Sequence, residues 1–480
     1  MTDKPGGSAV SPGKAFAVVA VAVFLATLDV FIVIAFPAIR AGFSGASVSD
    51  VSWVLNVYAI AFAALLVPAG KLGDIVGRRR VFVAGLILFG AGSALCAAAP
   101  SLGFLIASRA VQAVGAAAVT PTSLGLVLPI FPPHRRPLVI SGWAAIGAVG
   151  AALGPALGGA LTEISWHWIF IVNVPLALIA SVAAVRLLAE IRDPDRQPLP
   201  DWVGTLLLIG AIGLLTLALV QGSTWDWDAR VIACLAGAAA LAALFVLRSA
   251  THPAPVLELS ILRVRAFALS SLSAALFFAA FAAMLLSSVL FLTNVWHYSA
   301  IKAGLLLTPG PLTAAVFAPL SGRLAARIGV GRVGALGAVL FVLGCLWWIW
   351  QVGIRPGYAT EILPGMLVGG SGVGLVLPAF TIAATSTLPP ARLATGIGAQ
   401  TMFRQIGATL GVAAFVAILG TPGPADVLDA FNDTRWFMSA TSVAAAIALV
   451  LIRPAARRRD DSPPEPATAA ADASRHETVS

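Results

Sequence analysis

The sequence predicts an all-α polytopic membrane protein, and three features of its composition carry this prediction. Of the 480 residues, 59% are hydrophobic and only 11% are charged, and the mean hydropathy is +0.95. Soluble domains carry about 25% charged residues because they need a polar surface. One membrane helix takes about 20 apolar residues, so the apolar content suffices for about fourteen spans.

The apolar runs between proline, glycine and charge clusters predict fourteen membrane helices. The first, residues 15–39, is too long for the apolar region of a signal peptide and is kept as a helix. The other thirteen are expected at residues 51–70, 81–99, 103–128, 138–161, 168–188, 202–220, 230–248, 267–292, 303–322, 333–351, 361–388, 394–419 and 435–452. Residues 1–14 are predicted to form a cytoplasmic N-terminus, and residues 453–480 a disordered cytoplasmic tail.

The positive charges orient these helices. With the N-terminus inside, 23 of the 30 Lys and Arg residues fall in inner segments, and two, Arg109 and Arg404, lie within spans. The five outer ones are Arg40, Arg230, Lys302, Arg355 and Arg435. This asymmetry follows the positive-inside rule and predicts that both termini are cytoplasmic. The net charge of +9 is therefore interpreted as a topology signal that favours anionic inner-leaflet lipid, and not as a nucleic-acid-binding surface.

An internal repeat divides the chain. Residues 70–80 and 322–332 both read G-x-L-x-x-x-x-G followed by arginine, at an offset of 252 residues or eight predicted helices. Two six-helix halves separated by two extra helices produce this spacing, as in transporters that rock around a central site. The predicted divisions are an N-terminal bundle at 15–190, two inserted helices (7 and 8) at 191–250, and a C-terminal bundle at 251–452.

Five short motifs carry a family resemblance. They are GKLGDIVG from Gly70, RAVQAVG from Arg109, GAALGPALGG from Gly150, WHWIFIVNVP from Trp166, and the helix-13 stretch from Thr395 through FRQIG to Gly411. In this order they resemble the motifs of the major facilitator superfamily, specifically its fourteen-helix drug:proton antiporters of the QacA/EmrB type. The resemblance implies a 6+2+6 major facilitator fold and a proton-coupled exporter. Phe31 departs from the family pattern, which has Thr in this turn of helix 1.

Asp29 is the only acidic residue near the middle of an apolar span, and its helical-face neighbours are apolar. An intramembrane carboxyl group is costly, which makes it a functional hypothesis by default. We expect Asp29 to carry protons and to bind cationic substrates. The alternative is a neutral acid that hydrogen-bonds to backbone.

Arg109 is expected to supply a positive charge that tunes the protonation of Asp29 and responds to its protonation state. The alternative is a structural arginine that is hydrogen-bonded to helix carbonyls. Other polar and aromatic side chains are predicted to line a substrate cavity, because aromatic rings attract lipophilic cations. These are Phe24, Phe31, Tyr58, Gln112, Gln400 and Arg404. For Arg404, contact with an anionic or polar substrate is weighed equally against a structural position in which it snorkels towards the inner leaflet.

Two further groups are assigned to conformational roles. The loop between helices 2 and 3 is predicted to act as a cytoplasmic gate, in which Asp74 pairs across that face or caps a helix and so holds one conformation closed. The residues assigned to this gate are Gly70, Gly73, Asp74, Gly77 and Arg78. Arg79 and Arg80 are assigned to topology. The small residues of helix 5 predict close packing and a kink, and the resemblance implies that this helix seals the interface between halves: Gly150, Gly154, Pro155, Gly158 and Gly159.

The sequence contains no phosphate-binding loop, no Cys or His pair at metal-ligand spacing and no catalytic cluster. It therefore predicts neither an enzyme nor a cofactor or metal site. The expected function is export of lipophilic cationic or neutral compounds against protons, by a monomer in the inner (cytoplasmic) membrane. The alternative is one endogenous metabolite, antibiotic or lipid on the same scaffold. A sensor, a channel or a membrane enzyme would need an output domain, a polar pore or a catalytic interface, which the sequence lacks.

Overall fold

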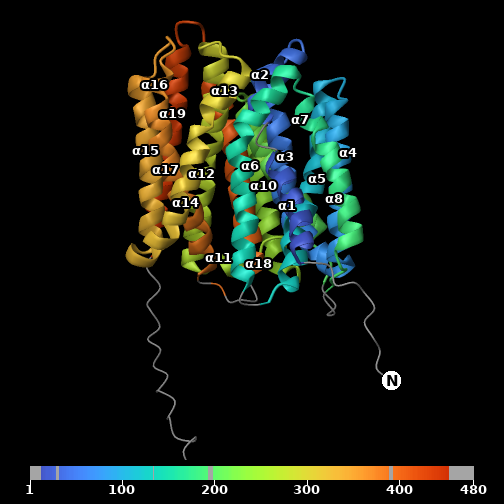
Figure 1. Ribbon diagram of the computed structural model, residues 1–480. Helices are drawn as coiled ribbons and strands as arrows, with labels where there is room; N and C mark the ends of the chain where they lie inside the picture. The colour runs from blue at the N-terminus through green and yellow to red at the C-terminus, as the bar shows by residue number, and fades with distance from the viewer. Residues whose placement is uncertain are drawn as a thin grey trace, which may run out of the picture.

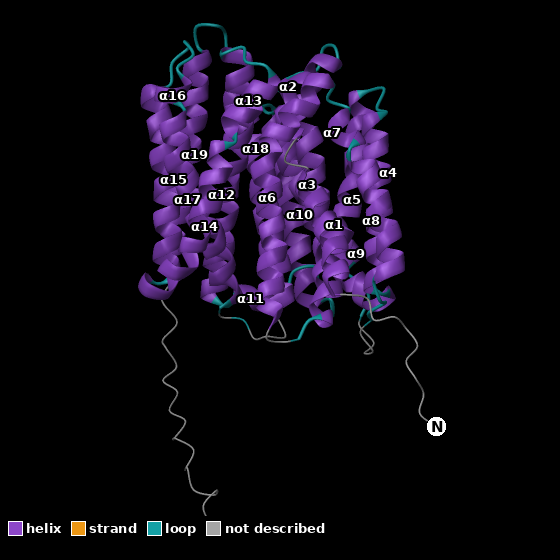
Figure 2. Cartoon of the chain, viewed as in Figure 1, coloured by secondary structure: helices purple, strands orange, loops and turns teal. Residues whose placement is uncertain are grey.

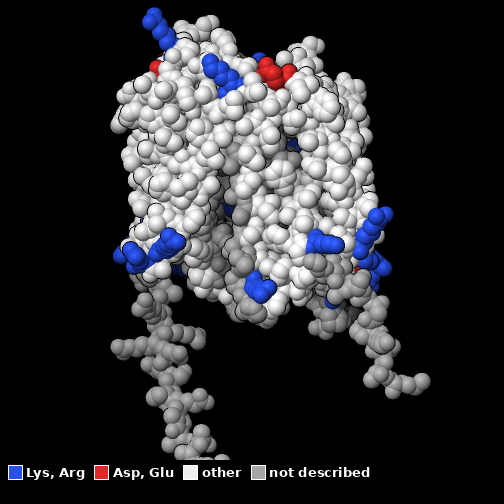
Figure 3. Space-filling view, in the orientation of Figure 1, with Lys and Arg blue, Asp and Glu red and all other residues white. Residues whose placement is uncertain are grey.

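A computed structural model describes residues 12–28, 32–132, 135–192, 198–386, 388 and 393–452. Within these ranges the secondary structure is helical and contains no strand (Figure 2). Eleven of the described helices are long and apolar enough to cross a membrane. The middle band of the face shown in Figure 3 is almost without charge. These findings confirm an all-α polytopic membrane protein, while the count of fourteen spans and the side of the termini stay predictions.

The helices stand side by side, and the first and last described residues lie at the same end (Figure 1). The first group of helices is α1 (Pro12–Leu28), α2 (Ile32–Gly42), α3 (Val48–Val76), α4 (Arg78–Ala97), α5 (Leu102–Val127), α6 (Arg136–Ile164), α7 (Trp168–Ile171) and α8 (Asn173–Leu187). Two helices follow, α9 (Trp202–Gln221) and α10 (Ala229–Thr251). The last group is α11 (Leu259–Leu262), α12 (Arg265–Leu290), the π-helix η4 (Phe291–Val295), α13 (Ala300–Leu307), α14 (Pro309–Ile328), α15 (Val330–Gln351), α16 (Tyr358–Glu361), α17 (Leu363–Thr385), α18 (Leu393–Leu419) and α19 (Val427–Val450).

Helix boundaries differ from the predicted ones where local chemistry was overlooked. The predicted helix 51–70 begins at Val48, because Ser47 and Asp50 form a capping box in which each side chain accepts the other's backbone N–H. The predicted helix 303–322 is divided into α13 and α14 at Pro309, which lacks a backbone N–H. The predicted helix 435–452 begins eight residues earlier, at Val427.

The repeated motif forms a one-residue turn in both halves, not the loop that was predicted. Gly77 (φ +124°) connects α3 to α4, and Gly329 (φ +91°) connects α14 to α15. A side chain is strained at such φ values, so glycine is the residue that permits the reversal. Gly70, Gly73 and Asp74 belong to the last turns of α3. The two glycines are separated by the same 252 residues as the sequence motif, which gives the repeat a structural counterpart.

The inserted pair α9–α10 packs on the line where the two groups of helices meet. Helix α9 contacts α10, and it also contacts α3 of the first group and α18 of the last. A separate apolar cluster joins them, including Ile60 and Ala63 of α3, Ile212 of α9, and Ala399 and Met402 of α18. Van der Waals contacts across this shared apolar surface hold α9 against both groups.

Candidate functional site

Arg109 is fully buried in α5 and connects three helices of the first group. Its Nε donates to the backbone oxygen of Val54 at 3.0 Å, and its Nη1 donates to Gln112. Gln112 in turn donates to Ser93 Oγ of α4 at 2.8 Å. The guanidinium carbon lies 4.1 Å from the centre of the Tyr58 ring, so cation–π attraction adds to the hydrogen bonds.

This geometry changes the expected positions of two cavity residues. Gln112 and Tyr58 are 1% and 5% exposed, so they lie inside the first group of helices and line no open space in this conformation. Phe24 is half-buried on α1. Asp29 and Phe31 lie outside the described residues, and the expected coupling between Asp29 and Arg109 stays a prediction.

Arg404 and Gln400 have different surroundings, although both lie on α18. Gln400 is buried and donates to the Phe380 carbonyl of α17 at 2.6 Å. Arg404 is half-buried, with its guanidinium carbon 4.3 Å from the centre of the Phe278 ring of α12. The face in Figure 3 is hollowed between the two groups of helices, and basic atoms are visible within the hollow.

Arg435, which was expected in an outer connection, is a buried charge that the sequence interpretation missed. It lies in α19 and is 4% exposed. Its Nη1 donates to the Trp348 carbonyl at 3.2 Å and to Asn432 Oδ1 at 2.8 Å, and its guanidinium faces the Phe291 ring. The signal was the spacing of Phe431, Thr434, Arg435 and Met438, which places Arg435 on the buried face of a helix that begins before it.

The gating residues bind within the first group of helices. Asp74 Oδ1 accepts from Arg78 Nε at 2.8 Å, one helical turn away, and Arg78 Nη1 donates to the Gly125 carbonyl of α5 at 2.9 Å. The expected pairing of Asp74 across the cytoplasmic face is not what this conformation shows. Gly73 permits the arrangement, because a Cβ at this position would lie 2.8 Å from Thr122.

Glu190, which the sequence interpretation did not single out, binds the turn between α3 and α4. Its Oε1 accepts the Arg79 N–H at 3.0 Å, and its Oε2 lies 3.9 Å and 3.7 Å from the Nε atoms of Arg79 and Arg80. A carboxylate at a helix N-terminus is stabilised by the helix dipole. Arg79 and Arg80, assigned only to topology, therefore also anchor the segment after α8.

The small residues of α6 form a seam with the other group of helices. Gly150, Gly154, Pro155, Gly158 and Gly159 are all buried. A Cβ at Gly159 would lie 2.6 Å from the Ala300 carbonyl of α13, and one at Gly304 would collide with the Pro155 carbonyl. Helices α6 and α13 therefore approach with their backbones almost in contact, as small residues permit in membrane proteins. The other large contact between the groups is made by α3 and α18, and smaller ones join α6 to α14 and α2 to α12 and α13.

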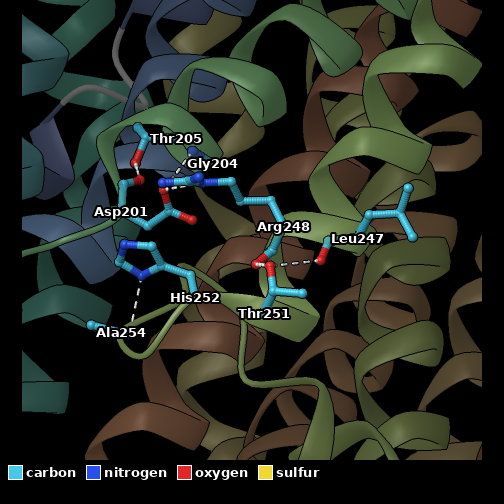
Figure 4. A network of polar contacts seen from close by, with 8 residues as sticks. All are labelled: Asp201, Gly204, Thr205, Leu247, Arg248, Thr251, His252 and Ala254. Carbon is cyan, nitrogen blue, oxygen red and sulfur yellow. Dashed lines mark hydrogen bonds and ion pairs between the residues drawn. The ribbon is translucent and has the colours of Figure 1, made fainter.

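A polar network fixes the start of α9 and the end of α10 (Figure 4). Asp201 Oδ1 accepts from the Gly204 N–H and from Arg248 Nε, both at 2.9 Å. Burial raises the pKa of Asp201, but the hydrogen bonds from Gly204 and Arg248, with the positive charges of His252 and Arg248, bring the pKa below its ordinary value. Nearby, Lys71 of α3 donates to the Pro255 carbonyl at 3.0 Å, which ties α3 to the segment after α10.

Comparison with known proteins settles the family. A model of the Major Facilitator Superfamily matches residues 19–412, with a second match at 272–477. The chain belongs to the Major Facilitator Superfamily. It is a transporter with several apolar membrane helices and not an enzyme, and the resemblance to drug:proton antiporters is confirmed at the level of the family.

Named relatives of this transporter include drug and antibiotic exporters. It is 33% identical to the multidrug resistance protein Stp of Mycobacterium tuberculosis over 82% of this chain and 74% of the relative. It is 34% identical to the probable actinorhodin transporter of Streptomyces coelicolor, over 85% and 73%. Among solved structures, an auto-inhibited POT family peptide transporter matches with a TM-score of 0.69 at 17% identity, over 93% and 98%. That last likeness concerns the fold alone. The relatives support a drug or antibiotic exporter of the major facilitator type.

Proposed function

We propose that this transporter exports lipophilic drugs or antibiotics across the cytoplasmic membrane in exchange for protons. The observation that carries the proposal is the pair of seams between two repeated groups of helices, α6 against α13 and α3 against α18. Rocking of one group against the other around such seams exposes a central space to each side in turn. The two copies of the glycine turn, at Gly77 and Gly329, mark equivalent positions at which each group reverses direction.

The proposed membrane topology and oligomeric state are those that the sequence predicts. Fourteen spans arranged as six, two and six, with both termini in the cytoplasm, fit the distribution of positive charge. The transporter acts as a monomer in the inner membrane, with small molecules, protons and lipid as its partners. The α6–α13 seam then lies towards the outside, and its close backbone contact keeps the outer side closed in this conformation.

The proton-coupling role is assigned to Asp29 and Arg109. An acid in a desolvated site takes up a proton where the outer pH is low and releases it to the cytoplasm. Competition between proton and substrate for one site couples the two binding equilibria, and linkage makes that coupling reciprocal. Arg109, held by Val54 and Gln112, supplies a fixed positive charge whose effect on Asp29 depends on the conformation.

The Asp29→Asn variant tests this coupling. In proteoliposomes with an imposed pH gradient, the wild-type transporter is expected to accumulate substrate in a gradient-dependent way. The variant is expected to lose at least 90% of gradient-driven transport while it inserts and binds substrate, because asparagine cannot exchange a proton. Full-rate, gradient-dependent transport by the variant would contradict the role of Asp29, and flux of the wild type that ignores the gradient would contradict antiport itself.

Export of one endogenous antibiotic or other metabolite is the second candidate. The relative that is named as a probable transporter of the single compound actinorhodin favours it. A panel of chemically unrelated lipophilic compounds distinguishes the two candidates. Export of several unrelated members supports the multidrug function, and saturable export of one class supports the dedicated one.

A further inference from the structure

Among the described membrane helices, three arginines lie at least seven residues from either helix end, and they differ in how their N–H groups are satisfied. Arg109 donates to the Val54 carbonyl and to Gln112, and Arg435 donates to the Trp348 carbonyl and to Asn432. Arg404 donates no hydrogen bond to any residue that the structure describes. Its one specific contact there is the Phe278 ring, 4.3 Å from the guanidinium carbon. It is also the least buried of the three.

The position of Arg404 makes this arrangement unusual. It is the twelfth of the 27 residues of α18, close to the middle of the helix, where a charged group is most costly. An aromatic face attracts the positive charge but accepts none of the five N–H groups in the way that an oxygen does. These donors therefore have no oxygen acceptor among the residues that the structure describes.

The described acidic residues do not supply that group. They form no ion pair with Arg404, and they lie at helix ends, in the first or last two turns, or in connections: Asp50, Asp74, Glu163, Glu190, Asp201, Asp226, Asp228, Glu258, Glu361, Asp426, Asp429 and Asp433. A guanidinium recognises a carboxylate or another oxyanion through two parallel charge-assisted hydrogen bonds. The ligand that best complements Arg404, among the groups that the described residues leave open, is thus an anionic oxygen.

The surroundings of Arg404 indicate an aromatic ligand. One turn further along α18, Gly407 lies against the backbone of Ala275 in α12, so the two helices are closely packed there. On α12 the ring of Phe278 lies edge-on to Phe281, with their centres 5.8 Å apart. A planar aromatic compound next to these rings buries apolar surface while its acidic group reaches Arg404.

We propose that Arg404 is a specificity residue that binds the carboxylate or phenolate of lipophilic aromatic substrates, with Phe278 contacting their rings. This inference rests on the proposed export function and names its substrate class. It replaces the expected preference for cationic compounds by a preference for anionic ones. For such substrates the proton on Asp29 and the substrate on Arg404 occupy different sites, so their coupling runs through the change of conformation and not through competition for Asp29.

Three xanthene dyes with a common ring system test the inference in pH-driven proteoliposomes. They are fluorescein, which is anionic, its neutral derivative methylated at both acidic groups, and rhodamine 123, which is cationic. The wild-type transporter is expected to export fluorescein at the highest kcat/KM. Arg404→Gln is expected to lower that value at least tenfold, mainly through KM, and to change export of the neutral dye less than threefold. Arg404→Lys is expected to restore part of the fluorescein transport.

Arg435→Gln is the matched control, because Arg435 is also a buried arginine over a phenylalanine ring but has protein acceptors. It is expected to lower the Tm and to leave the ratio of fluorescein to neutral-dye transport unchanged. An equal loss of all three dyes in a folded Arg404→Gln protein would show a structural role and overturn the inference, as would wild-type preference for rhodamine 123. Gradient-driven export of none of the dyes or panel compounds would overturn the proposed function instead.

Discussion

At the scale of single residues, Asp201 combines a helix cap with an ion pair. Its carboxylate accepts the Gly204 N–H at the start of α9 and binds Arg248 of α10, while its side chain is completely buried. The Arg248 side chain is 38% exposed, so solvent weakens the pair and most of the benefit comes from the hydrogen bonds. One residue thus fixes both the beginning of α9 and its attachment to α10.

Replacement of Asp201 by alanine is expected to lower stability by roughly 2 kcal/mol, because the cap and the Arg248 bond are both lost. The pH dependence follows from the lowered pKa of Asp201. A carboxyl group whose pKa is lower in the folded state contributes fully above its unfolded value of about 3.9, and that contribution is lost as the pH falls through the folded value.

Thermal unfolding of the detergent-solubilised protein between pH 7 and pH 3 measures this effect. The difference in Tm between wild type and Asp201→Ala is expected to stay constant from pH 7 to pH 5 and to shrink below pH 4. A difference that grows as the pH falls would contradict the assigned direction.

At the scale of elements, the α6–α13 seam depends on the absence of side chains. Close backbone approach gives many van der Waals contacts between helices in a membrane, where the hydrophobic effect does not drive them together. Gly159 and Gly304 occupy the two sides of this approach, and Thr162 donates to the Gly158 carbonyl within α6. A single methyl group is therefore enough to disturb the seam.

Gly159→Ala is expected to destabilise the conformation closed at α6–α13 by about 1–3 kcal/mol, since its Cβ would lie 2.6 Å from the Ala300 carbonyl. Transport in proteoliposomes is expected to fall at least fivefold, because the equilibrium between the two end conformations of the transport cycle is shifted away from the one that is closed at α6–α13. Gly213→Ala in α9 is the control, because nothing lies within 4 Å of a Cβ there. Equal transport by the two variants would show that the seam does not stabilise one conformation over the other.

At the scale of the whole molecule, the two groups of helices meet along two lines that are covered differently. The α3–α18 line is covered by α9, through the apolar cluster that includes Ile60, Ile212 and Met402. The α6–α13 line has no such inserted helix among its described contacts. Any rocking motion must therefore move α3 or α18 against α9, and the inserted pair becomes part of the moving interface.

A cross-link between Val67→Cys in α3 and Gly398→Cys in α18 tests that motion. A Cβ at position 398 would lie 3.4 Å from the Val67 side chain, which brings two cysteines within reach of a disulfide or a short bifunctional reagent. Oxidation is expected to reduce transport at least tenfold, and reductant to restore it, with each single-cysteine variant as control. Undiminished transport by the cross-linked protein would show that the groups do not separate at this line.

The sequence predicted the general architecture because membrane helices leave strong one-dimensional signals. Long apolar runs, the placement of arginine and the glycine repeat each depend on the residues themselves or on their spacing. The packing of side chains between helices was predicted less well from the sequence. Tyr58 and Gln112 were expected to line a cavity and lie buried around Arg109, while Glu190 was overlooked because its partners Arg79 and Arg80 are more than a hundred residues away.

The sequence by itself determined that this is a helical membrane protein, because the cost of exposing charge and backbone to lipid acts on each segment separately. Its repeated motif predicted two related parts. Only the tertiary structure decided which buried charges have partners. Arg109 and Arg435 find acceptors on neighbouring helices, whereas Arg404 meets a ring of α12. Hydrogen bonds require atoms within about 3 Å of each other, and chain spacing does not determine which helices approach that closely.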